Sequence, residues 1–120
     1  MKPNLRNSTI ALVAGHSADA LVTASALAIE RGNVIEGNRL IRVLAVSAAR
    51  FGKESWQNGD WIAAGLAVAS VKILAVLLVA GLIVAGSCHL ERVPHAAKFV
   101  GLLAAVGFLA AASNLVVMFA

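Results

Sequence analysis

Two long runs of apolar residues occupy the second half of the chain. The first extends from residue 61 to residue 86 and is interrupted only by Ser70 and Lys72. The second extends from residue 99 to residue 120. At 1.5 Å per helical residue the runs reach about 39 Å and about 33 Å, so each can cross a hydrocarbon core of about 30 Å. The short segment 87–98 between them predicts an antiparallel hairpin of two transmembrane helices.

The first half of the chain predicts two amphipathic helices. N-cap residues near Thr9 and a C-cap at Gly32 indicate that the first helix runs from about residue 9 to residue 31. We interpret it as retained rather than cleaved, because polar residues interrupt the apolar centre that a signal peptide needs. Its polar residues share one strip, opposite its apolar residues: His16, Asp19, Thr23 and Glu30 against Ile10, Val13, Leu21, Ala24 and Ala28.

The second helix is predicted from about residue 38 to residue 51. Its arginine-rich polar side is typical of a helix on an anionic leaflet, and packing on a neighbouring subunit explains the pattern equally well. Trp56 and Trp61 then flank the entry into the membrane as expected interfacial anchors. We therefore expect an all-α protein with two parts, an amphipathic helical segment at 1–53 and a transmembrane hairpin at 54–120.

Composition supports a membrane protein and excludes several other classes. Hydrophobic residues make up 60% of the 120 residues and charged residues 13%, against about 25% charged residues in soluble domains. Cys88 is the single cysteine, so no intrachain disulfide forms. Cys88, His89 and His95 lack an evident fourth metal ligand. Because paired carboxylates, nucleophile–base pairs and phosphate-binding glycine loops are also missing, we expect no enzymatic activity, metal or cofactor.

The net charge of +4 comes from ten Lys and Arg against six Asp and Glu. These charges are thinly spread, which fits anionic lipid headgroups better than sequence-specific binding of nucleic acid. Seven of the basic residues precede Trp61, whereas the loop holds only Arg92 and Lys98. The positive-inside rule therefore predicts a cytoplasmic N-terminal half and an outward loop.

Lys72 is the most informative polar residue, because an unpaired ammonium in hydrocarbon costs a few kcal/mol. It shares its depth with Asn114, about 21–23 Å from the loop side. Ser70, Ser113 and Asn114 are the expected hydrogen-bond partners of the ammonium, which leaves its charge to be balanced elsewhere. Neither predicted span contains Asp or Glu. We therefore expect no salt bridge inside them and no proton transport of the ATP-synthase rotor type. Lys72 then contacts a lipid phosphate, a channel or an acidic partner, or it snorkels to the nearer interface.

Small residues crowd both predicted spans, and small faces let helices approach closely in lipid. One hairpin cannot use so many small faces, so we expect a homo-oligomer. An alanine-rich composition without structural meaning is the alternative. The expected packing positions are Gly65, Ala69, Gly101, Ala104, Gly107 and Ala111.

The FGKES sequence at residues 51–55, the long apolar helix, the short basic loop and the closing apolar helix together resemble conjugative type IV secretion pilins. The resemblance is to the F-like group and covers about residues 46–120. It implies a hairpin stored in the bacterial inner membrane and extracted into an extracellular tube with structural phospholipid, with secretion-machinery proteins as partners. It also implies loss of a long leader and a loop that lines the lumen. Lys72, Arg92 and Lys98 are the expected contacts to lipid or lumen.

Two other classes share the pattern. A holin-like pore-former is also short, basic and oligomeric, although holins tend to end in a basic tail and this sequence ends in VVMFA. A structural subunit of a larger membrane complex would dock partners on its N-terminal helices. Shearable filaments, lysis on induction and co-purification with fixed partners would distinguish the three classes.

Overall fold

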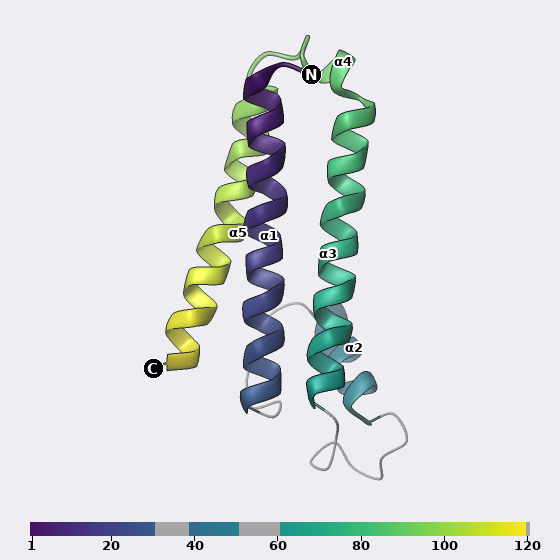
Figure 1. Cartoon of the computed structure of the whole chain (residues 1–120), viewed down its shortest axis with the longest axis vertical. Coiled ribbons are helices and arrows are strands. Elements are labelled where there is room, and N and C mark those ends of the chain that lie inside the picture. Colours follow the sequence, from purple (N-terminus) through teal and green to yellow (C-terminus); the bar gives the residue numbers. More distant parts are fainter. Residues whose placement is uncertain (31–38, 51–60, 120) are drawn as a thin grey trace.

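The computed structural model of the chain describes residues 1–30, 39–50 and 61–119 (Figure 1). Most residues in these ranges are helical, and none of them lies in a strand. Three of the helices are long and apolar enough to cross a membrane, α1, α3 and α5. FGKES and Trp56 lie outside the described residues. The helices are α1 (Pro3–Glu30), α2 (Arg39–Arg50), α3 (Trp61–Ala85), α4 (Ser87–Leu90) and α5 (Ala96–Phe119).

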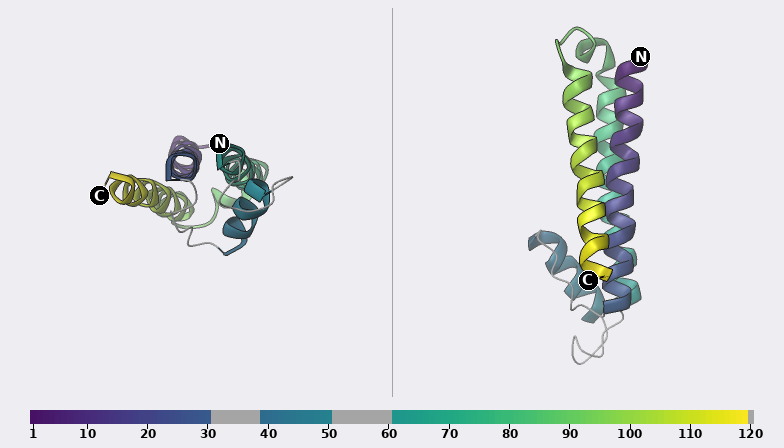
Figure 2. Two further views of the ribbon diagram at one scale, coloured as in Figure 1. Left: turned by 90° about the horizontal axis from the view of Figure 1, so that it is seen from below. Right: turned by 90° about the vertical axis from the view of Figure 1, so that its left-hand side faces the viewer.

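α1 lies between the two predicted spans and packs along both (Figures 1 and 2). α3 and α5 correspond to these spans and run antiparallel, joined through the short helix α4. They meet mainly through α1 rather than through one another. The two helices thus have the antiparallel connection of the predicted hairpin, and α1 lies between them, a position that the sequence did not predict.

α1 turns His16, Asp19 and Thr23 of its polar strip toward α3 and α5, together with the buried residues Leu5, Leu12 and Leu27. The two largest residues of the opposite side face outward. Thr23 of the strip is buried, whereas Ile10 and Leu21 on the opposite side are 61% and 58% exposed. A helix on the surface of a soluble protein would turn its apolar side toward the protein and its polar side toward water. Outward apolar and inward polar side chains suit a helix surrounded by hydrocarbon. α1 is therefore a third candidate span, in addition to the two that the sequence predicted.

α1 also begins earlier than expected. The helix includes Pro3, a residue that is favourable in the first turn because its missing N–H has no partner there anyway. Asn7, Ser8 and Thr9 were the expected N-cap residues, but all three lie within the helix. The hydroxyl of Thr9 donates to the carbonyl of Leu5 at 2.8 Å. The helix thereby gains about one and a half turns, which makes it 28 residues long.

Glycines set the closest approaches between helices. A Cβ atom on Gly107 of α5 would lie 2.7 Å from the backbone of Gly15, and one on Gly65 of α3 would lie 2.7 Å from the carbonyl oxygen of Ala24. No side chain fits at these separations, so both helices contact the α1 backbone directly. We expected small residues to pack between copies of the chain. At these two crossings they pack between helices of one chain instead.

α2 closes the end of the bundle away from α4. Its Ala45 packs with Leu27 of α1 and with Trp61 and Val68 of α3. The helix agrees closely with the predicted range 38–51 and packs on its own chain, a possibility the sequence did not suggest. Trp61 is covered by this cluster and is only 6% exposed.

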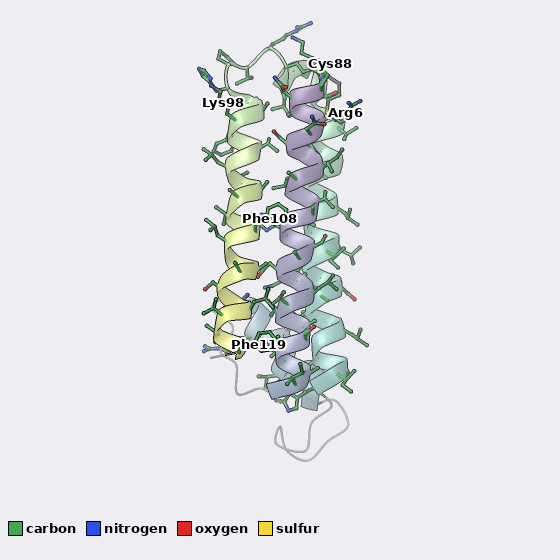
Figure 3. The ribbon with its side chains drawn as sticks, turned by 60° about the vertical axis from the view of Figure 1, so that its left-hand side comes forward. Arg6, Cys88, Lys98, Phe108 and Phe119 are labelled. Carbon is green, nitrogen blue, oxygen red and sulfur yellow. The ribbon has the colours of Figure 1, made fainter. Side chains whose placement is uncertain are left out.

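The N-terminus lies at the same end of the bundle as the loop between α3 and α5. The amino group of Met1 is 4.0 Å from Glu91 Oε1, and the backbone N–H of Lys2 donates to the same carboxylate. Figure 3 shows Arg6 and Lys98 together at this end.

The sequence assigned seven basic residues to one side of the membrane and two to the other. The two ends of the bundle do not carry this division. Because α1 runs the length of the bundle, it carries Lys2 and Arg6 to the end that holds Arg92 and Lys98. That end has four basic residues, and the segment between α1 and α3 has five. The count no longer favours either orientation in the membrane.

Gly107→Ala is expected to destabilise the fold by about 1–3 kcal/mol, because its Cβ would overlap the α1 backbone. Gly101→Ala is the matched control, since the nearest heavy atom to its Cβ would be 3.6 Å away. Unfolding in mixed detergent–SDS micelles, followed by tryptophan fluorescence, measures both. Equal midpoints for the two variants would contradict the close α1–α5 crossing.

Cysteine labelling tests which ends lie together. A membrane-impermeant maleimide should reach Cys88 and, in a Cys88→Ser background, Asn4→Cys from the same side of the membrane. Ser47→Cys on α2 should react only from the opposite side; all three positions are exposed. Labelling of Asn4→Cys and Ser47→Cys from one side would exclude α1 as a span.

Candidate functional site

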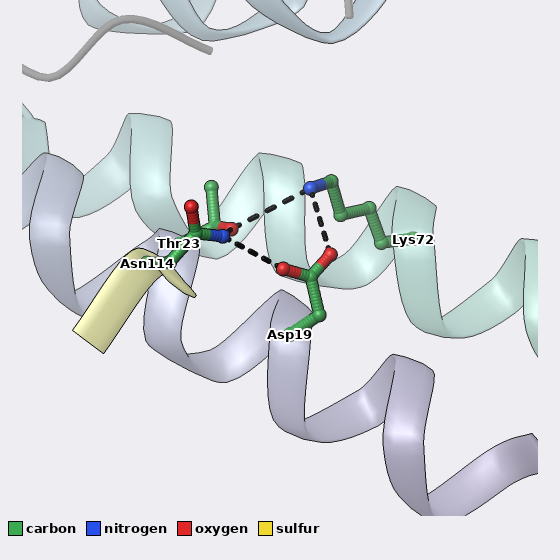
Figure 4. Close-up of polar contacts among 4 residues, drawn as sticks. All are labelled: Asp19, Thr23, Lys72 and Asn114. Carbon is green, nitrogen blue, oxygen red and sulfur yellow. Dashed lines mark hydrogen bonds and ion pairs between the residues drawn. The ribbon is translucent and has the colours of Figure 1, made fainter. Parts of the chain in front are cut away.

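Four polar side chains from three helices meet inside the bundle (Figure 4). Asp19 and Thr23 are four residues apart on α1 and therefore share a face. Lys72 Nζ of α3 donates to Asp19 Oδ2 at 3.3 Å, and Asn114 Nδ2 of α5 donates to Asp19 Oδ1 at 2.8 Å. One carboxylate thus links all three candidate spans. We refer to Asp19, Thr23, Lys72 and Asn114 as the polar cluster.

Thr23 is the second acceptor in the polar cluster. Its hydroxyl oxygen is 3.3 Å from Asn114 Nδ2 and 3.5 Å from Lys72 Nζ. The ammonium and the amide NH₂ only donate, and the carboxylate only accepts, so every contact joins a donor to an acceptor. Thr23 is buried, and a hydroxyl at this place lowers the cost of holding Lys72 and Asp19 away from water.

Lys72 forms a salt bridge that the two predicted spans alone do not offer. The prediction considered carboxylates only in those spans, and Asp19 belongs to α1. The Lys72 and Asp19 side chains are 18% and 14% exposed, so the pair lies mostly within the protein. The ammonium therefore has a partner without snorkelling and without a lipid phosphate.

Asn114 and Lys72, predicted at one depth, both reach Asp19. The two serines beside them do not join the polar cluster, because Ser70 and Ser113 are exposed on the outer sides of α3 and α5. The polar strip on α1 was the signal that could have identified Asp19 as the partner. Reading it required α1 to be treated as a span.

His16 makes a further link between α1 and α5. Its Nε2 is 2.9 Å from the carbonyl oxygen of Leu103. Because a carbonyl oxygen only accepts, Nε2 carries the proton in this contact. The hydrogen bond lies next to the close approach of Gly15 and Gly107, so polar and steric contacts coincide at this crossing.

An open groove of about 500 Å³ borders the polar cluster, and we call it the bundle groove. One wall comes from apolar residues of α3, and Leu103 of α5 contributes the opposite wall. Polar groups of α1 and Lys72 lie between these walls. The lining residues are Leu12, His16, Asp19, Val71, Lys72, Ala75, Val76, Val79 and Leu103.

The predicted packing residues lie in or near the bundle interior. Gly101 is half-buried, and the other five are buried: Gly65, Ala69, Ala104, Gly107 and Ala111. Gly65 and Gly107 directly face the α1 backbone. Ala104 belongs to the main apolar cluster with Leu12 and Val76.

The three residues predicted to contact lipid or a lumen do not form one site. Lys98 lines a hollow of about 410 Å³ at the loop end, together with Lys2, Glu91 and His95. Arg92 is exposed at the same end. Lys72 lies inside the bundle in the polar cluster, so it is separated in role and position from the two loop residues.

Within residues 1–30, 39–50 and 61–119 no three His, Cys, Asp or Glu side chains are grouped to hold a metal ion. Comparison with models of known protein families, with curated proteins and with solved structures finds no match to this chain. Its function is therefore inferred from its own residues and their geometry.

Asp19→Leu is expected to lower stability by about 2–4 kcal/mol, because the mostly buried Lys72 ammonium loses its carboxylate partner. The double variant Asp19→Leu with Lys72→Met should recover most of this loss, since two apolar side chains carry no uncompensated charge. Detergent–SDS unfolding of the wild type, both single variants and the double variant completes the cycle. Additive losses would mean that the two residues do not interact.

Proposed function

We propose that this chain is a structural subunit of the bacterial inner membrane that crosses the bilayer three times and assembles with copies of itself. The proposal rests on the orientation of α1, because His16, Asp19 and Thr23 face α3 and α5 while Ile10 and Leu21 face outward. Lipid makes this arrangement favourable, because apolar side chains have no reason to avoid hydrocarbon and polar ones do. The outer sides of α3 and α5 carry exposed leucines as well.

The polar cluster supports a structural role. Each oxygen of the Asp19 carboxylate already accepts a hydrogen bond from another helix. Removing either partner would leave a charge or an amide in the membrane interior, so the cluster holds the three helices in one register. Intramembrane polar contacts of this kind each contribute about 0.5–2 kcal/mol to helix association.

A pilin-like subunit of a conjugative or type IV secretion filament, with bound phospholipid, is the form of assembly that the resemblance of residues 46–120 suggests. The Asp19–Lys72 pair favours a mature subunit that keeps α1. Loss of residues 1–50 would remove the carboxylate beside Lys72 and the backbone on which Gly65 and Gly107 pack.

Electron microscopy of sheared and membrane fractions from expressing cells, combined with intact mass, tests this function. We expect filaments or discrete multi-copy particles that contain the intact 12.3 kDa chain. Filaments built only from residues beyond about 50 would contradict the retention of α1. A full-length monomer in lipid nanodiscs would contradict self-assembly, and lysis on induction without such assemblies would favour the holin-like alternative.

A further inference from the structure

The bundle groove continues an interface that a helix already occupies. On α3, α2 covers Trp61, Ala64 and Val68. Val71, Ala75 and Val79 follow on the same side of α3 at helical spacing. The second set lines the bundle groove. Because α2 ends before reaching it, this part of the side is covered by no other described helix.

The occupant of the bundle groove must offer a polar group at one depth. Asp19 and Lys72 line the groove and keep 14% and 18% of their side-chain surfaces exposed. Hydrocarbon next to these charges would add to their desolvation cost, whereas a hydroxyl would lower it. The rest of the lining is largely apolar. A mostly apolar helix with a small hydroxyl residue at the level of Lys72 meets both requirements.

We infer that the outer side of α3 from a second copy of this chain fills the bundle groove, an inference that rests on the proposed self-assembly. This outer side carries the exposed residues Ser70, Leu74, Leu77, Gly81 and Val84, which we call the outer stripe. Their spacing of four, three, four and three residues is the spacing of a helix that packs along another helix.

Depth is the first reason for this assignment. Copies inserted in the same orientation keep each residue at the same depth, so the two α3 helices run parallel. Ser70 of the second copy then lies within about 3 Å of the level of Lys72 in the first, because the two positions are two residues apart. The one hydroxyl of the outer stripe thus meets the charged part of the bundle groove.

Size is the second reason. Leu74 and Leu77 of the outer stripe come to the level of Ala75, where the groove wall is smallest. Gly81 comes near the level of Val79, where the wall is larger. No atom lies within 4 Å of a Cβ placed on Gly81, so this glycine relieves no crowding within its own chain. A glycine at this position lets the helix of a second copy approach closely.

The contact would propagate from copy to copy. The outer stripe and the groove wall lie on opposite sides of α3, so one copy can give its outer stripe to one neighbour and receive another neighbour's in its groove. Such a head-to-tail contact forms a ring or an open filament rather than a symmetric pair.

Gly81→Leu tests this interface without disturbing the subunit, because open space surrounds the position within the chain. We expect association in nanodiscs or mild detergent to weaken about tenfold or more, as native mass spectrometry or fluorescence energy transfer would measure. Ala105→Leu, a similar enlargement on the exposed outer side of α5, should leave association unchanged. Unchanged association of Gly81→Leu would overturn the inference.

Cross-linking identifies the contact directly. In a Cys88→Ser background, copies with Leu74→Cys should cross-link to copies with Ala75→Cys, and copies with Leu109→Cys on the outer side of α5 should not. Assembled wild-type chain with no Leu74–Ala75 cross-link would overturn this interface but keep self-assembly. Bound phospholipid in a monomeric wild type would instead overturn both, with lipid as the occupant of the groove.

Discussion

The structure depends on keeping the Lys72 ammonium paired inside an apolar bundle. No carboxylate on α3 or α5 can supply that pairing, so the two most hydrophobic helices require a third helix that carries one. α1 brings Asp19 to Lys72 and Asn114, with Thr23 beneath them. This requirement explains why α1 keeps a polar strip, and why the strip faces inward.

Close backbone contact makes this pairing geometrically possible. At Gly65, α3 contacts the α1 backbone at Ala24. At Gly107, α5 contacts the α1 backbone at Gly15. The two crossings lie on either side of Asp19 along α1. Side chains from α3 and α5 can therefore both reach the same carboxylate. Steric contact and polar contact thus specify one register, and the open side that remains between α3 and α5 is the bundle groove.

The sequence predicted α3 and α5 within a few residues, because uninterrupted apolar runs of this length have few alternatives. It also predicted α2 and the shared depth of Lys72 and Asn114. It did not predict α1 as a candidate span, because His16, Asp19 and Thr23 make that helix resemble an amphipathic one. A hydrophobic pattern shows that two sides of a helix differ, and only the partners of Asp19 show that its polar residues face inward. The Asp19–Lys72 pair and the position of Lys2 beside Glu91 were not predicted for the same reason.

Solid-state NMR of the full chain in lipid bilayers tests whether Lys72 is paired with Asp19. A through-space correlation between Lys72 ¹⁵Nζ and Asp19 ¹³Cγ measures whether the two groups are in contact when lipid is present. We expect this correlation in the wild type and no correlation of Lys72 ¹⁵Nζ with the side chain of residue 19 in Asp19→Leu, which has no acceptor. A correlation of Lys72 ¹⁵Nζ with lipid ³¹P and none with Asp19 would show that Lys72 pairs with a headgroup, and would contradict the three-helix account.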